Sequence, residues 1–249
     1  MKMKIPKSHP RYHSLVIREK LAEGFRKGLV HETGLIAHGR GEAFDYLIGE
    51  RTTEIAELAE KTAAALLLIA KHPVISVNGN TASLVGRECV ELAERIPAKI
   101  EVNLFHRTEE RVRRIIEELE SFGACDVLGD KPDARIEGLD HPRGLCCKEG
   151  IYSADVVLVP LEDGDRCEAL VKMGKKVIAI DLNPLSRTSQ RASITIVDNV
   201  VRAIPNISKW VDELRDKDME ELRDMVDSWD NKKSLQKTLE YISKRINPP

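Results

Sequence analysis

The feature of the sequence that most constrains its fold is a regular alternation of short apolar runs with longer amphipathic segments, which begins at Pro73. The runs are rich in Val, Ile and Leu along their whole length, which is typical of strands that are buried on both faces. Such strands, separated by helices, indicate a parallel sheet. The sequence therefore predicts an α/β fold with a Rossmann-like parallel sheet flanked by helices. The predicted strands lie in the segments 73–80, 98–105, 154–164, 175–183 and 192–199.

We divide the chain into a helical N-terminal region (1–72), a Rossmann-like α/β core (73–215) and C-terminal helices packed on the core (216–249). In the N-terminal region, the glycine-containing segment from His31 predicts a loop with a short helix from Glu42, followed by a long helix capped by Thr52 or Thr53. The helix that follows residue 199 is expected to be interrupted at Pro205, because proline lacks an N–H group.

Charge, hydropathy and cysteine content exclude several classes of protein. Lys and Arg number 39 against 41 Asp and Glu, which argues against a nucleic-acid binder. The N-terminus lacks the apolar segment of a signal peptide, and the longest apolar run, 63–70, falls far short of the ~20 residues of a membrane span. The five cysteines contain no CxxC pair, so we expect reduced thiols and no metal site in a soluble, cytoplasmic protein without membrane contact.

Ligands of parallel α/β sheets bind beyond the carboxyl ends of the strands, and the segment "VNGNTAS" (77–83) occupies one such end. Gly79 permits a positive φ and close approach of a ligand, and a helix that begins at Thr81 offers free backbone N–H groups to a phosphate. The candidate substrate-binding residues are Asn78, Gly79, Asn80, Thr81 and Ala82. An ordinary capping turn is the alternative interpretation. Neither a GxGxxG motif nor a Walker P-loop is present.

Two neighbouring predicted strands end in the same residue types. These ends carry Asp181 and Asn183, and Asp198 and Asn199. Their carboxylates could hold ribose hydroxyls or a magnesium ion, and their amides could bind a base edge. The loop between the strands contains Arg187 and Thr188, which can surround a phosphate. A solvated loop with capping Asp and Asn is the alternative for either end alone, but the pair of ends favours a nucleotide site.

A third group of candidates is basic and lies in the N-terminal region. It consists of Arg18, His31, His38 and Arg40. Three glycines, at 34, 39 and 41, surround His38 and Arg40 and would let a loop fold close to a ligand. A structural or solvated histidine is the alternative for His38.

Four segments together resemble one family, the archaeal 4-phosphopantoate–β-alanine ligases, also called phosphopantothenate synthetases. They are "IPKSHPRYHSLVIREKL", "GLIAHGRGEAFDYLIGE", "SVNGNTA" and "IDLNPLSRTSQRASITIVDN". The resemblance runs along the whole chain. It implies a homodimer that condenses 4-phosphopantoate with β-alanine to 4'-phosphopantothenate at the expense of ATP, releasing AMP and pyrophosphate, in archaeal coenzyme A biosynthesis.

The resemblance also assigns residues to the nucleotide. By motif, ATP binding falls on Arg18, Arg40, Asp181, Leu182, Asn183, Arg187, Thr188, Asn199 and Val200. Arg18, Arg40 and Arg187, with Mg²⁺, suit neutralisation of charge in the transition state, Arg40 and His38 are the catalytic candidates, and His38 suits acceptance of the β-alanine proton. A non-catalytic nucleotide or phosphometabolite sensor is the alternative function, and a sugar-phosphate isomerase or kinase is another enzyme that could use the turn at 78–82.

Overall fold

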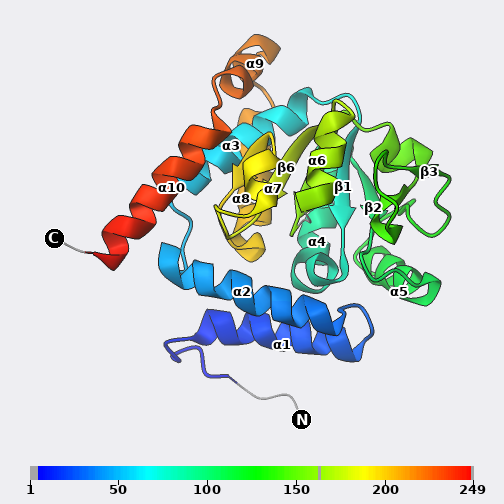
Figure 1. Ribbon diagram of the computed structural model, residues 1–249, viewed down its shortest axis with the longest axis horizontal. Helices are drawn as coiled ribbons and strands as arrows, with labels where there is room; N and C mark the ends of the chain where they lie inside the picture. The colour runs from blue at the N-terminus through cyan, green and yellow to red at the C-terminus, as the bar shows by residue number, and fades with distance from the viewer. Residues whose placement is uncertain (1–4, 162–163, 248–249) are drawn as a thin grey trace.

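Five parallel strands form the central sheet of the protein (Figure 1). The computed structural model describes residues 5–161 and 164–247. The strand order is β2-β1-β5-β6-β7. All neighbouring strands pair in parallel, so successive strands of the sheet are joined by crossovers rather than hairpins. The predicted parallel α/β sheet is confirmed. The strands are β1 (Pro73–Val77), β2 (Lys99–Val102), β5 (Val156–Pro160), β6 (Lys176–Ile180) and β7 (Ile194–Ile196).

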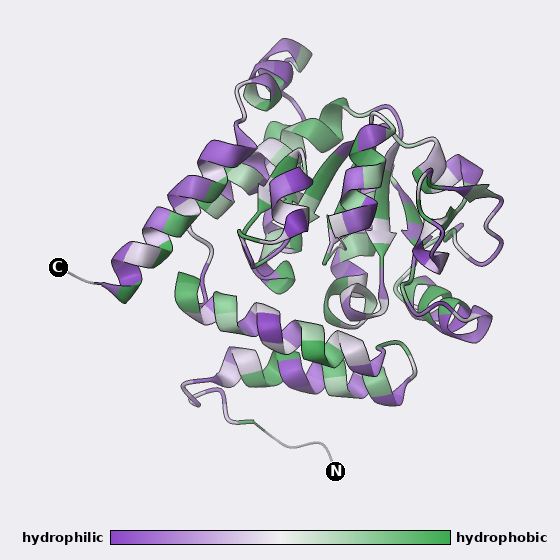
Figure 2. Cartoon of the chain, in the orientation of Figure 1, coloured by the Kyte–Doolittle hydropathy of each residue, from purple (hydrophilic) through white to green (hydrophobic). Residues whose placement is uncertain are grey.

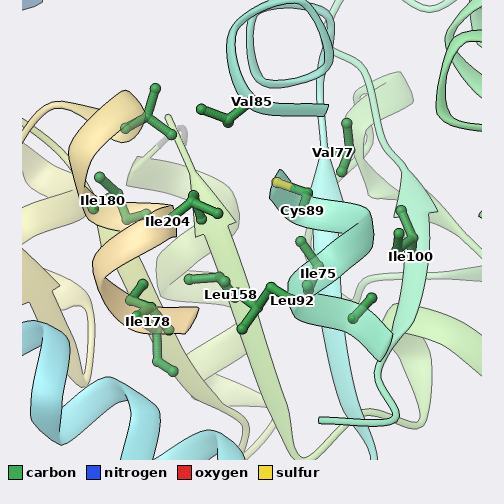
Figure 3. Close-up of a cluster of buried hydrophobic side chains, with 14 of the residues drawn as sticks. Ile75, Val77, Val85, Cys89, Leu92, Ile100, Leu158, Ile178, Ile180 and Ile204 are labelled. Carbon is green, nitrogen blue, oxygen red and sulfur yellow. The ribbon is translucent and has the colours of Figure 1, made fainter. Parts of the chain in front are cut away.

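One face of the sheet packs against four helices. Ile75, Leu158 and Ile178 point to this face and lie in one apolar cluster with Cys89 and Ile204 from the covering helices (Figure 3). Because these side chains exclude water from the sheet, they supply the main apolar stabilisation of the fold. The helices are α3 (Glu54–Ile69), α4 (Gly79–Arg95), α5 (Glu109–Glu120) and α8 (Val200–Leu214).

The opposite face of the sheet is also buried, which explains why the strands are apolar along their whole length. Val157 and Val177, each one residue away from a side chain of the first face, pack here with Leu170 of α6 (Gly164–Lys172). The excursion between α5 and β5 adds Ile136 and Ile151. That excursion contains a two-stranded antiparallel ribbon, β3 (Ala134–Arg135) and β4 (Leu145–Cys146), and the helical turns η1 (Pro142–Gly144) and η2 (Lys148–Tyr152).

Helices from both ends of the chain surround this core. Figure 1 shows α1 (Tyr12–Arg26) and α2 (Glu32–Ile48) side by side beneath the carboxyl ends of the strands. The helix α9 (Met219–Asp227) packs on α3, and α10 (Asn231–Ile246) packs on α2, α3 and the short α7 (Arg187–Arg191). Polar residues cover the outer sides of these helices, and the strands are apolar (Figure 2). Thr53 caps α3 by accepting a hydrogen bond from the Ala56 N–H, as predicted.

The predicted loop from His31 was wrong, because α2 is one continuous helix from Glu32 to Ile48. Its buried residues are Glu42, Asp45 and Ile48, so its inward side shows no apolar stripe that the sequence could reveal. Gly34 serves packing rather than loop formation, because a side-chain carbon there would lie 2.4 Å from Asn80 Oδ1, whereas one at Gly39 would meet nothing within 4 Å.

Two further local predictions were wrong. Residues 187–191, expected as part of a loop, form α7, whose first turn is capped when Ser186 Oγ accepts a hydrogen bond from the Ser189 N–H. The helix α8 continues through Pro205, which lies on its exposed side, where water can bond the carbonyl that loses its partner.

Over the described ranges, no helix has the length and apolar character needed to cross a membrane. All five cysteines are free thiols in this structure. Four of them are buried, and only Cys125 is exposed.

Candidate functional site

The helix α2 crosses the carboxyl edge of the sheet, which we define as the side on which the strands end. Near its start, the Gly34 carbonyl accepts a hydrogen bond of 2.9 Å from Asn80 Nδ2, beyond β1. Near its end, Asp45 Oδ2 accepts a hydrogen bond of 2.7 Å from Asn199 Nδ2, beyond β7. Between them, a side-chain carbon at Gly41 would lie 3.6 Å from Leu182, beyond β6. The structure thus brings α2 and the three predicted strand-end segments together at one edge.

The end of β6 is organised by Asp181. Its Oδ1 accepts a hydrogen bond from the Asn183 N–H at 2.9 Å, and its Oδ2 accepts one from Ser186 Oγ at 2.5 Å. Burial raises the pKa of Asp181 above its ordinary value. Asn183 Oδ1 in turn accepts from the Leu185 N–H. Asp181 therefore shapes the turn that leads into α7, while the Asn183 side-chain N–H₂ group forms no hydrogen bond with the residues that the structure describes.

Arg187 and Thr188 differ in their exposure. Arg187 is exposed at the start of α7 and forms ion pairs with Asp165, at 2.7 Å, and Glu168, at 3.6 Å. Exposed ion pairs of this kind contribute only about 0–1 kcal/mol, so Arg187 can exchange these partners for a phosphate. Thr188 is buried inside α7, where its backbone carbonyl accepts from Cys167 Sγ.

The end of β7 belongs to a buried charge network. Asp198 accepts hydrogen bonds from Thr52 Oγ1 at 2.6 Å and from Arg202 at 2.5 Å. Arg202 also bonds Asp45 of α2 at 2.5 Å. Asn199 caps α8 through its Oδ1, and the adjacent Val200 is buried as the first residue of that helix. Asp198 is therefore fully occupied in joining α8 to α2 and α3.

The two candidate arginines of the N-terminal helices are in different environments. Arg18 of α1 donates a forked pair of hydrogen bonds to Glu42 of α2, with the shortest N–O distance at 2.7 Å, and this bonding raises its pKa. Burial alone would raise the pKa of Glu42, but bonds from Arg18 and Tyr46 hold it below its ordinary value. Arg40 is exposed on α2 and forms no ion pair or hydrogen bond with the described part of the chain. Arg40 is thus an exposed cation, unpaired within the described residues, on the helix that crosses the carboxyl edge.

His38 lies on the inward side of α2, because it precedes the buried Glu42 by one helical turn. The ring is half-buried, and its Nε2 atom is buried with no hydrogen-bond partner among the described residues. Burial is the main cause that lowers the pKa of His38, and Arg18 lowers it further, against the opposing effect of Glu42 and Asp45. The ring is therefore neutral near pH 7 and can accept a proton.

The turn that follows β1 uses its polar groups internally. Asn78 Oδ1 caps α4 by accepting from the Thr81 N–H at 3.0 Å, and its Nδ2 donates to the Leu161 carbonyl at 2.9 Å. Thr81 Oγ1 bonds the Pro160 carbonyl at 3.2 Å, and Ala82 is buried.

The backbone at Gly79 does not use the positive φ that glycine permits, and α4 begins there rather than at Thr81. A side-chain carbon at Gly79 would lie 2.0 Å from the Leu29 carbonyl oxygen. The glycine is needed because the α1–α2 turn approaches this point closely.

No group of three or more His, Cys, Asp or Glu side chains is placed to hold a metal ion within residues 5–161 and 164–247. The acidic candidates are occupied, Asp181 by its own turn and Asp198 by Arg202. These residues do not fit a resident Mg²⁺ site, so no step below is derived through a metal bound by the protein.

Sequence reasoning missed the residues that hold the edge together, above all Glu42, Asp45 and Arg202. Their signals were weak: Asp198 and Arg202 have the i, i+4 spacing of an ion pair, but the partners on α2 are more than a hundred residues away in sequence. It also missed Arg111, whose Nε donates a hydrogen bond of 2.8 Å to the Leu29 carbonyl beside Gly79.

Comparison with known proteins gives a consistent result. The model of the phosphopantothenate/pantothenate synthetase family matches residues 55–245. A 4-phosphopantoate–beta-alanine ligase of Thermococcus kodakarensis is 58% identical, over 97% of this chain and 93% of its own length. Ligases of the same name from Thermococcus onnurineus and Methanosarcina mazei are each 56% identical, over 98% and 97% of this chain and 94% and 95% of theirs. The chain belongs to the phosphopantothenate/pantothenate synthetase family.

Proposed function

We propose that the protein is an ATP-dependent ligase that condenses 4-phosphopantoate with β-alanine to 4'-phosphopantothenate, with release of AMP and pyrophosphate. The observation that carries this proposal is the convergence of three strand ends with α2, which presents a free arginine and a neutral histidine at one edge. The names of the near full-length relatives support the substrates and the C–N bond.

ATP is proposed to lie over the ends of β6 and β7. The residues assigned to it are Arg18, Arg40, Asp181, Leu182, Asn183, Arg187, Thr188, Asn199 and Val200. Their placement on neighbouring strand ends and on the helices that cross them supports this assignment, because a polyphosphate needs cations from several directions. Arg40 and Arg187 are the exposed cations of the set, and the Asn183 amide can bond a base edge. Asp181, Asn199 and the buried Leu182, Thr188 and Val200 shape the surface beneath the nucleotide.

The proposed reaction has two steps because a carboxylate is a poor electrophile. In the first, an oxygen of the 4-phosphopantoate carboxylate attacks the α-phosphorus of ATP, and the bond from that phosphorus to the bridging oxygen breaks, releasing pyrophosphate. In the second, the β-alanine amine attacks the acyl carbon, and the C–O bond breaks with its electron pair on AMP. The protein holds the reactants in line and offsets the developing charge.

Arg40 and His38 receive separate roles in this scheme. Arg40 stabilises the negative charge that grows on the α-phosphate, which it can do because the described residues leave it unpaired. His38 accepts the proton that the amine loses, because burial keeps its ring neutral. The turn at Asn78–Ala82 is proposed to border the 4-phosphopantoate site.

Mg²⁺ is proposed to enter with ATP rather than to occupy a protein site, since this ion commonly stays with substrate phosphates and water. We further propose that the protein is a cytoplasmic homodimer, with the division into 1–72, 73–215 and 216–249 given above.

The decisive experiment incubates the protein with ATP, 4-phosphopantoate and β-alanine and identifies the nucleotide product. We expect AMP and pyrophosphate in equal amounts with the amide product. Formation of ADP and phosphate would replace the adenylate with an acyl-phosphate route. Nucleotide binding without any consumption would leave the sensor as the better description.

A further inference from the structure

A cavity of about 610 Å³ lies between the turn that joins α1 to α2 and the start of α5. We call it the α5 cavity and define it by five of the residues that line it, which are His31, His106, Arg107, Arg111 and Arg114. It is separate from the β6 and β7 ends, where ATP is proposed to bind. The helix α5, whose first turns line the cavity, lies on the β2 side of the sheet, away from β6 and β7 (Figure 1).

The lining of the α5 cavity carries an excess of positive charge. Three arginines face two carboxylates, Glu32 and Glu110, and Glu110 already forms an ion pair with Arg114. Arg107 donates to the Gly129 carbonyl at 2.5 Å. The twelve-residue helix α5 also begins here, so its N-terminal partial charge adds to the positive potential.

Arg111 is the central cation of the cavity. Its Nε donates to the Leu29 carbonyl and its Nη1 to the His106 carbonyl, each at 2.8 Å. Burial lowers the pKa of Arg111, and the nearby Arg143 lowers it further. Arg111 forms no ion pair with a carboxylate in the described ranges. A half-buried guanidinium that bonds only carbonyls leaves a charge that an anion would offset.

The two histidines add a second, independent feature. Their rings stack with centroids 3.9 Å apart and planes 15° apart. His31 Nδ1 accepts from the Thr33 N–H, so its remaining polar atom, Nε2, is available for a ligand. Burial lowers the pKa of His31, followed by the effects of His106 and Arg111. Positive charge on the His31 ring is therefore unfavourable until an anion arrives to share it.

The cavity adjoins the turn that was predicted to bind the substrate phosphate. A side-chain carbon at Gly79 would lie 2.7 Å from Arg111 Nη2, so this guanidinium reaches the first residue of α4. The side chains of Asn78, Asn80 and Thr81 are used in bonds to the protein itself. The cationic groups thus lie beside the turn rather than within it.

We propose that the α5 cavity binds the phosphate group of the phosphorylated acid substrate, with Arg111 as its main ligand and His31 and His106 beside it. This inference rests on the proposed function. The phosphate and the carboxylate stand at opposite ends of 4-phosphopantoate, so a phosphate held here directs the carboxylate across the edge toward the nucleotide. Such a site would also select the phosphorylated acid over free pantoate.

The test compares Arg111→Gln and His106→Ala with wild type, using 4-phosphopantoate and free pantoate as alternative substrates. Charged hydrogen bonds are worth about 1.5–3 kcal/mol, so Arg111→Gln should lower kcat/KM for 4-phosphopantoate by about ten- to a hundredfold. The KM for ATP and any turnover of free pantoate should not change. His106→Ala should lower kcat/KM for 4-phosphopantoate by a smaller factor, again without affecting pantoate. Because the His106 side chain is exposed, we expect this variant to fold normally. His72→Ala, an exposed histidine next to the amino end of β1, is the matched control.

Direct titration with inorganic phosphate separates this inference from the proposed function. Wild type should bind phosphate, and 4-phosphopantoate should displace it while ATP should not; both variants should bind it more weakly. The inference would be overturned if a variant lost kcat/KM equally for 4-phosphopantoate and pantoate, or if ATP alone displaced the bound phosphate. It would also be overturned if both variants kept the wild-type preference for 4-phosphopantoate over pantoate. If wild type binds phosphate in this cavity but forms no amide, the proposed reaction fails and the anion site stands.

Discussion

The charge network behind the carboxyl edge offers a sharp test, because one partly buried arginine serves two buried carboxylates. Arg202 donates to Asp198 at 2.5 and 2.8 Å and to Asp45 at 2.5 Å. Burial alone would lower the pKa of Arg202, but its bonds to Asp45 and Asp198 raise it. We therefore expect Arg202→Met, which keeps much of the side-chain volume, to leave both carboxylates without their cation.

The size of the effect follows from burial. The side chains of Asp198 and Asp45 are 0% and 7% exposed, so water cannot replace the guanidinium. Removing one partner of a buried ion pair costs about 3–5 kcal/mol. For a chain of this size, each kcal/mol lowers Tm by about 2–4 °C, so the variant should melt about 6–20 °C below wild type.

Urea denaturation and thermal melting monitored by circular dichroism measure this difference. Asp45→Asn should lower the free energy of unfolding less in the Arg202→Met variant than in wild type, because in that variant it removes a buried carboxylate that has lost its cation. Arg223→Met, at an exposed arginine of α9, serves as the control and should change stability by less than about 0.5 kcal/mol. A loss below about 1 kcal/mol for Arg202→Met would refute the reasoning.

Three further predictions address the site and its support. Arg40→Ala should lower kcat by at least about tenfold with Tm unchanged, since the side chain is exposed and unpaired within the described chain, and Arg223→Ala should change neither. Burial and the neighbouring aspartate raise the pKa of Glu60 to about 9, so the folded protein holds a proton that the unfolded chain loses above about 4.5. The free energy of unfolding should therefore fall as the pH rises between these values. Denaturation curves at pH 5, 7 and 9 should show that Glu60→Gln removes most of this loss of stability, whereas the exposed control Glu57→Gln does not. Gly79→Ala should reduce both stability and activity, because its methyl group would lie 2.0 Å from a backbone carbonyl of the α1–α2 turn; unchanged melting would show that this turn yields easily.

The sheet could be predicted because burial on both faces leaves a clear signal in the sequence. Runs such as Val156–Pro160 and Lys176–Ile180 are apolar because neighbouring side chains face different helices. The helix α2 gave no such signal. Its inward side carries Glu42 and Asp45, whose burial depends on Arg18 and on Arg202. A polar face is stable inside a protein only when its partners are present, and their positions depend on the tertiary fold.

The convergence of the strand-end residues was more predictable than the state of their side chains. Because the carboxyl ends of parallel strands lie at one edge of a sheet, the sequence correctly placed residues near 80, 182 and 199 along one edge. It could not show that Asp198 belongs to an internal network, or that the polar groups after β1 bond the protein. The sequence shows which residue types lie at a strand end. Whether each hydrogen-bond donor or acceptor there is free for a ligand or already bonded within the protein depends on the packing of the folded chain.

The two arginines of the N-terminal helices show that neighbouring cations can differ in whether they are bonded within the protein. Arg18 is held by a forked bond to Glu42, which joins α1 to α2 and offsets part of its charge. Arg40, two residues before Glu42, has no such partner in the described chain and keeps its full attraction for a polyanion. The two arginines therefore have different roles. Arg18 fixes the helix that crosses the carboxyl edge, and Arg40 is an unpaired cation on that helix within the described residues. A helix fixed in this way loses little conformational freedom when a ligand binds, so more of the electrostatic attraction remains available for binding and for stabilising the transition state.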